Sequence, residues 1–136
     1  MQSANLEDLK RYIAELTLFM QDQGIGSDVN PKITLDSGDQ EEAVFIMTGS
    51  YNPASQHITL FIKNRHPKDI LRSYAHEFIH HDQNLKNQIP LEGDYGEGYA
   101  QRNQVLRNLE EDAFLRGNMA FRDWTDSKKN NNKKQR

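Results

Sequence analysis

The spacing of apolar residues along the chain predicts three helices and three strands. From Leu6 to Met20 apolar residues recur every three or four positions, which indicates an amphipathic helix over residues 3–23. Gly24 can end this helix, because glycine readily adopts the left-handed conformation that follows a last helical turn. A connector rich in turn-forming residues comes next.

Three short extended segments are expected after this connector, at Lys32–Asp36, Ala43–Thr48 and Gln56–Lys63. In the third segment apolar and polar residues alternate, so one of its faces should be buried. Turn-forming residues occupy positions 49–55 and predict an antiparallel hairpin between the second and third segments. Together these segments predict a small, mostly antiparallel three-stranded sheet.

Two more helices are expected in the C-terminal half. One begins near His66, where Pro67 suits the first turn because no backbone donor is needed there, and continues to Leu85. The other runs from about Tyr99 to Trp124. Its inner stripe mixes small and large residues: Leu106, Leu109, Ala113, Gly117, Ala120 and Trp124. Helices and strands in this order predict an α+β fold.

Length and composition narrow the class of protein. The chain has 136 residues, the size of one domain, which we expect to cover residues 1–126. No apolar run approaches the ~20 residues of a membrane helix, and the N-terminus lacks the pattern of a signal peptide. The absence of cysteine excludes disulfide frameworks, thiol catalysis and cysteine-based zinc sites. These features predict a cytoplasmic protein.

Charge is distributed unevenly along the chain. The net charge is −3, but the last nine residues, from Lys128 to Arg136, hold five basic residues and no acidic one, so the rest carries −8. An acidic body is a poor electrostatic match for nucleic acid. We expect residues 127–136 to form a disordered basic tail that takes no part in chemistry.

The second predicted helix carries the sequence His76-Glu77-Phe78-Ile79-His80. Residues four apart lie one above the other on a helix, so both imidazoles can face one metal ion. Two neutral imidazoles and a carboxylate suit Zn²⁺ and leave one position for water, toward which Glu77 can act as general base. A chance match to this pattern in a chain of this composition has a probability on the order of 1 %. The pattern therefore favours a catalytic zinc site over two surface histidines.

A third protein ligand is expected on the last helix, within Glu110-Glu111-Asp112-Ala113. We favour Glu110, because it shares a helix face with Ala113 and Gly117, and small residues there let two helices approach closely. Glu111 is the alternative ligand. Asp112 is a candidate for orienting a ligand histidine.

Several other polar residues have more than one interpretation. Tyr95 and Tyr99 lie in or beside a glycine-rich loop and could donate a hydrogen bond to a developing oxyanion, or could simply pack. His81 should point away from the metal, so we expect it to be exposed or at most to contact substrate. His57 and His66 are isolated and are expected to be structural or to face solvent.

The pattern His76-Glu77-x-x-His80 with a downstream Glu110-x-x-Ala113 resembles the gluzincin metallopeptidases. The chain is also similar to a group of small uncharacterised phage and bacterial proteins of this kind, over roughly residues 43–124. The resemblance implies a minimal zincin core: a small sheet with an edge strand near the cleft, an active-site helix and a C-terminal third-ligand helix. In such folds the edge strand can pair with an extended peptide, and we expect Gln56–Lys63 to be that strand.

The sequence therefore predicts a zinc-dependent peptidase in which His76, His80 and Glu110 hold one Zn²⁺ and Glu77 is the general base. One alternative is a phage-encoded zinc-binding module without turnover, whose coordination would be closed. Another is a zinc amidase that acts on a non-peptide or cell-wall amide. The expected partner is a peptide or protein substrate, not a membrane or nucleic acid, and a phage-encoded protein would act in the host cytoplasm.

Overall fold

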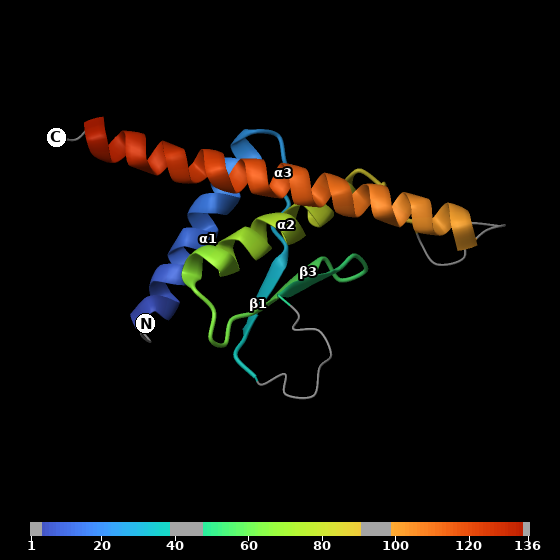
Figure 1. The fold of residues 1–136 in the computed structure, drawn as a ribbon, viewed down its shortest axis with the longest axis horizontal. Helices are drawn as coiled ribbons and strands as arrows, with labels where there is room; N and C mark the ends of the chain where they lie inside the picture. Colours follow the sequence, from blue (N-terminus) through green and yellow to red (C-terminus); the bar gives the residue numbers. More distant parts are fainter. Residues whose placement is uncertain (1–3, 39–47, 91–98, 135–136) are drawn as a thin grey trace.

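Three helices and one three-stranded sheet make up the described part of the chain (Figure 1). The structure is a computed structural model, and it describes residues 4–38, 48–90 and 99–134, without the side chains of residues 4–5, 99–103 and 130–134. The predicted α+β class is confirmed. In chain order the elements are α1 (Ala4–Asp22), β1 (Lys32–Asp36), β2 (Gly49–Asn52), β3 (His57–Phe61), α2 (Pro67–Leu85) and α3 (Tyr99–Lys134).

The sheet is mixed and not mostly antiparallel as expected. Its strand order is β1-β3-β2, with β1 parallel and β2 antiparallel to β3. β3 takes the centre because it carries the most buried side chains of the sheet, with Ile58 and Leu60 fully inaccessible. The prediction that Gln56–Lys63 is the edge strand near the cleft is therefore wrong.

The predicted hairpin exists, but its first strand lies later in the chain than expected. β2 occupies residues assigned to the turn, and Thr48 only extends it by accepting a hydrogen bond from the Phe61 N–H at 3.2 Å. Most of the expected strand Ala43–Thr48 lies outside the described residues. The turn itself is short, and Asn52 Oδ1 accepts a hydrogen bond from the Ala54 N–H at 2.9 Å.

α1 covers one side of the core with the predicted stripe. Leu9, Ile13, Leu16 and Met20 are buried, while Leu6 at the start of the stripe is 39 % exposed. Gly24 follows the helix with φ +87°, as a helix end requires.

α2 is the central element, and it packs against α1, α3, β2 and β3 (Figure 1). It begins where the sequence predicted: the His66 side chain caps it by accepting a hydrogen bond from the Lys68 N–H at 3.0 Å. Because α2 has neighbours on several sides, most of its surface is buried. Its buried residues are Ile70, Leu71, Tyr74, Ala75, Glu77, Phe78, Ile79, His81, Asp82 and Gln83.

α3 is longer than predicted, since it continues past Trp124 to Lys134 (Figure 1). Residues 125–134 contain no glycine or proline, so no residue in this stretch breaks the helix. Lys128, which we expected in a disordered tail, forms an ion pair with Glu15 at 2.9 Å and lies over the rings of Tyr12 and Trp124. None of the described helices contains a stretch long and apolar enough to cross a membrane.

Candidate metal centre

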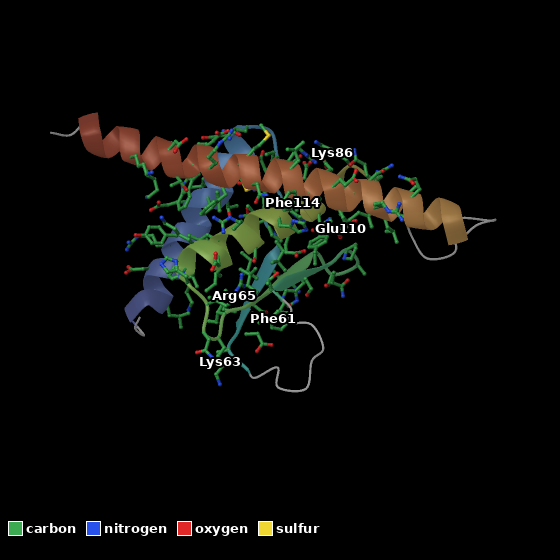
Figure 2. The ribbon with its side chains drawn as sticks, viewed as in Figure 1. Phe61, Lys63, Arg65, Lys86, Glu110 and Phe114 are labelled. Carbon is green, nitrogen blue, oxygen red and sulfur yellow. The ribbon has the colours of Figure 1, made fainter. Side chains whose placement is uncertain are left out.

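α2 and α3 bring together the three side chains that the sequence selected as metal ligands. His76 Nε2 lies 3.1 Å from Glu110 Oε1, and His80 Nε2 lies 3.2 Å from Glu110 Oε2. One ligand atom from each residue lies within 4.8 Å of the other two. Figure 2 shows Glu110 on the side of α3 that faces the sheet. Glu111 is exposed and does not belong to this cluster.

The close approach of the two helices depends on small residues of α3. A Cβ atom at Gly117 would lie 3.0 Å from the Cα and 3.1 Å from the backbone nitrogen of His76. Ala113 is fully buried in the same interface. Since Glu110 precedes Gly117 by two helical turns on the same face, this contact determines how far Glu110 stands from the histidines.

Gln83 fixes the tautomer of His80. The side-chain nitrogen of Gln83 donates to the Leu109 carbonyl and to Asp112, both at 2.9 Å, and neither partner can donate in return. The amide oxygen of Gln83 must therefore accept the proton of His80 Nδ1, 2.8 Å away. This leaves the lone pair of His80 on Nε2, the atom that faces Glu110, which is the form that binds a metal ion.

Charged residues behind Gln83 hold it in place. Asp112 accepts two hydrogen bonds from Arg116, at 2.8 and 2.7 Å. Arg116 also reaches Asp82 at 3.0 Å, and Asp82 accepts the N–H of Gly26 at 2.9 Å. Asp112 thus acts on His80 through Gln83 and not directly. We name Gly26, Asp82, Arg116, Asp112 and Gln83 the backing network.

Sequence reasoning missed four members of the backing network: Gly26, Asp82, Gln83 and Arg116. Asp82 lies on α2, Arg116 on α3 and Gly26 in the connector after α1, so no local pattern joins them. The sequence offers one signal, the glycine at position 26. Its φ is +79°, and a Cβ atom there would overlap the ring of Phe78, so only glycine fits.

Both histidines of the cluster are suited to bind as neutral ligands. Burial and the neighbouring His80 lower the pKa of His76, against the opposing effect of Glu110. With Nδ1 of His80 committed to Gln83, Nε2 of His80 and the Glu110 carboxylate are two acceptors in contact. Such a contact is repulsive unless a proton or a cation lies between them. Two imidazoles and one carboxylate are the donor set of a catalytic zinc site, so these residues fit the ion.

Glu77 lies beside the cluster at the wall of a pocket. Its side chain is only 8 % exposed, and this burial raises the pKa of Glu77 to about 7, with His80 lowering and Glu110 raising it. Gly49 of β2 stands opposite, where a Cβ atom would be 3.2 Å from Glu77 Cγ. The pocket, about 360 Å³, is lined by the cluster, Glu77, Gly49, Ser50, Tyr51, Pro53, Ile89, Leu106 and Leu109.

The other candidate residues have different outcomes. His81 is fully buried, so the prediction of an exposed side chain is wrong. The sheet covers that side of α2, and His81 contacts the Tyr51 hydroxyl at 2.7 Å and the Val29 carbonyl at 2.8 Å. The structural interpretation of His57 and His66 is confirmed, by a 2.7 Å contact to Thr34 and by the α2 cap respectively. Tyr95 lies outside the described residues, as does the side chain of Tyr99.

Comparison with known proteins adds no assignment: no family model, curated protein or solved structure matches the chain. The gluzincin resemblance therefore stays a prediction, and the site itself carries the functional argument.

Proposed function

We propose that the protein is a zinc-dependent peptidase with a minimal, gluzincin-like zincin core. The observation that carries this proposal is the convergence of His76, His80 and Glu110 beside the buried Glu77, at a pocket that opens to solvent. A structural zinc site needs no buried carboxylate next to its ligands.

The three ligand candidates would hold one Zn²⁺ through Nε2 of each imidazole and the Glu110 carboxylate. A zinc ion bound there lowers the pKa of a water molecule toward neutrality and polarises a carbonyl oxygen. Gln83 and the backing network would keep His80 in the binding tautomer, because its other nitrogen is occupied by a hydrogen bond.

Glu77 would move the proton in this reaction. Burial makes its carboxylate a stronger base than an exposed one, with a pKa near the pH of the cell. In peptide hydrolysis Glu77 takes one proton from the attacking water and gives it to the leaving nitrogen, while the oxygen of the water joins the carbonyl carbon. The second proton of the water then passes to the same nitrogen, so the products are a carboxylate and an ammonium group, and Glu77 ends as the unprotonated base.

The edge of β2 supports an extended peptide as substrate. Thr48 pairs with Phe61, so in an antiparallel ladder Ser50 and Asn52 also face β3, and the backbone groups of Gly49 and Tyr51 point away from it. Both residues line the pocket beside the metal cluster. A peptide that pairs with this edge would pass the cluster, and this role moves from Gln56–Lys63 to β2.

Elemental analysis of the purified protein, combined with digestion of a mixture of extended peptides, tests the proposal. We expect one zinc per chain and cleavage that is abolished by a chelator. Glu77→Gln should keep stoichiometric zinc and lose cleavage, because it preserves the shape of the side chain but cannot accept the proton.

Other results would favour the alternatives. Stoichiometric zinc with no cleavage of any peptide would favour a non-catalytic module, and hydrolysis of cell-wall amides alone would favour an amidase. Cleavage by Glu77→Gln at the wild-type rate would contradict the proposed mechanism.

A further inference from the structure

β1 has one edge that pairs with no strand among the described residues. The Lys32 N–H donates to the Gln56 carbonyl, and the Asp36 carbonyl accepts from the Ile62 N–H, both at 2.9 Å. In a parallel ladder alternate residues bond the same neighbour, so Thr34 also faces β3. The backbone groups of Ile33 and Leu35 therefore point away from the sheet. Proteins generally cover such edges, because they attract other strands.

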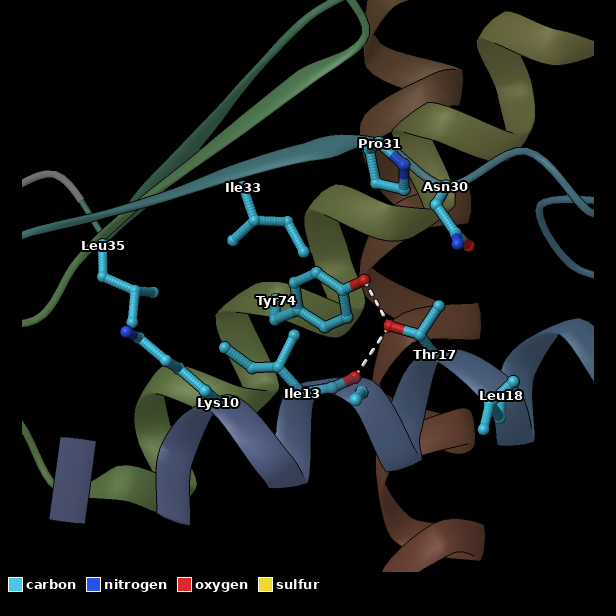
Figure 3. A pocket seen from close by; sticks show the side chains of 10 residues that line it. Lys10, Ile13, Thr17, Leu18, Asn30, Pro31, Ile33, Leu35 and Tyr74 are labelled. Atoms are coloured by element: carbon cyan, nitrogen blue, oxygen red, sulfur yellow. Dashed lines mark hydrogen bonds between the residues drawn. The ribbon is translucent and has the colours of Figure 1, made fainter. Parts of the chain in front are cut away.

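One face of this edge is apolar. Figure 3 shows Ile33 and Leu35 pointing from β1 toward α1, over a pocket of about 460 Å³. Tyr74 and Thr17 lie in this pocket, joined by a 2.5 Å hydrogen bond, and Leu18 of α1 contributes to its lining while 64 % exposed. An added strand would therefore gain backbone hydrogen bonds and apolar contacts together.

The sequence of β1, Lys32-Ile33-Thr34-Leu35-Asp36, is complementary to itself in an antiparallel arrangement. With Thr34 opposite Thr34 of another copy, Ile33 lies opposite Leu35 and their outward backbone groups exchange hydrogen bonds. The same arrangement places Lys32 opposite Asp36 on the other face, twice in the pair. Opposite charges at directly facing positions stabilise strand pairing.

The neighbouring registers lack this match. Centring the pair on Ile33 would require a backbone donor from Pro31, which has none, and would place Lys32 opposite Thr34. Centring it on Leu35 would place Lys32 opposite Gly38. Only the register centred on Thr34 satisfies both the backbone and the charges.

We infer that two copies of this chain associate through β1, in the register centred on Thr34, to form one six-stranded sheet. The strand order across the dimer is β2-β3-β1-β1-β3-β2. Both β2 edges, with the pockets that contain His76, stay at the outer ends of this sheet and remain accessible. The inference does not depend on the metal or on the proposed activity.

Charge exchange tests the register. The full chain would be studied by sedimentation between about 1 µM and 1 mM, with the variants Lys32→Asp and Asp36→Lys and the double variant. We expect the wild type to dimerise reversibly and each single reversal to weaken dimerisation by about tenfold or more, because two pairs change from attraction to repulsion. The double variant should restore it. Arg107→Asp, an exposed reversal on α3, is the matched control and should leave dimerisation unchanged.

Amide exchange measured by NMR provides an internal control within the same strand. The Thr34 amide, which faces β3, should be protected at every concentration, whereas the amides of Ile33 and Leu35 should become protected only as the dimer forms. A chain that stays monomeric up to 1 mM would overturn the inference. So would a dimer that is insensitive to both single reversals, because its copies would then associate through another surface.

Discussion

His80 and His81 are neighbours on α2, yet their surroundings differ in every respect that matters for chemistry. His81 faces the sheet, and both of its ring nitrogens are used, by the Tyr51 hydroxyl and the Val29 carbonyl. His80 faces α3, where Gln83 uses only Nδ1 and leaves Nε2 toward Glu110. A histidine becomes available as a ligand when its neighbours satisfy one nitrogen and leave the other toward an open pocket.

The largest expected effect comes from replacing each of these two histidines by alanine. His80→Ala should lower zinc affinity by at least about 100-fold and abolish peptide cleavage, because it removes a ligand. His81→Ala should keep zinc but destabilise the fold by about 2–3 kcal/mol, since it removes a fully buried side chain together with its contacts to the Tyr51 hydroxyl and the Val29 carbonyl. Zinc stoichiometry and urea unfolding of both variants measure the two effects. If His81→Ala lost zinc and His80→Ala kept it, the roles that we assign to the two histidines would be reversed.

The next expected effect concerns the distance between the two helices. Gly117→Val should force α3 away from the His76 backbone, destabilise the protein by about 1–3 kcal/mol and weaken zinc binding at the same time. Leu115→Val changes an exposed position of the same helix, and its effect should stay within about 0.5 kcal/mol. Equal effects of the two variants would mean that the close contact does not hold Glu110 in place.

A smaller effect is expected from the groups that support each histidine. Gln83→Leu should weaken zinc binding by about 10–100-fold, because the tautomer of His80 is no longer fixed. Tyr51→Phe removes the corresponding support from His81 and should cost about 1 kcal/mol of stability with unchanged zinc affinity. Zinc titrations of both variants check the comparison. If Tyr51→Phe weakened zinc binding as much as Gln83→Leu, the distinction between a ligand histidine and a structural histidine would be contradicted.

The smallest expected effect is a loss of stability in acid, measured on the metal-free protein. Burial alone would raise the pKa of Asp82, but hydrogen bonds from Gly26, Lys86 and Arg116 outweigh it and leave that pKa below its usual value. Such a group stabilises the fold above its unfolded pKa of about 3.9, and this contribution is lost as pH falls through the lower folded value. In Asp82→Asn the urea concentration at the unfolding midpoint should depend less on pH between about pH 5 and pH 2, the range in which such a carboxylate titrates. An unchanged slope would remove Asp82 from the acid response.

The parts of this molecule that were predictable from sequence are those encoded within one element. The HExxH pattern and the Glu110–Gly117 spacing each lie on a single helix, so helical periodicity was enough to place them. The position of β2 was not predictable, since Gly49-Ser50-Tyr51-Asn52 is composed of turn formers and becomes a strand only by pairing with β3.

The wrong prediction for His81 and the failure to predict the backing network have a common cause. Both depend on which element covers which side of α2, and this arrangement is not encoded in any local pattern. The C-terminal extension of α3 has a different cause. Lys128 binds Glu15, which is more than a hundred residues away in sequence, and composition alone made the segment look disordered.

The unequal support of α3 has a mechanical consequence. Among the α3 side chains that the structure describes, the buried Ala113, Ala120 and Trp124 lie C-terminal to Glu110, as do the close approach of Gly117 to His76 and the ion pair of Lys128 with Glu15. On the N-terminal side of Glu110 the support is weaker: Leu106 and Leu109 are half-buried, and the Leu109 carbonyl accepts a hydrogen bond from Gln83. A metal ion bound by Glu110 would attach this part of α3 to α2 a second time. Metal binding would then reduce the motion of residues 104–110, and that motion would indicate whether the site is occupied.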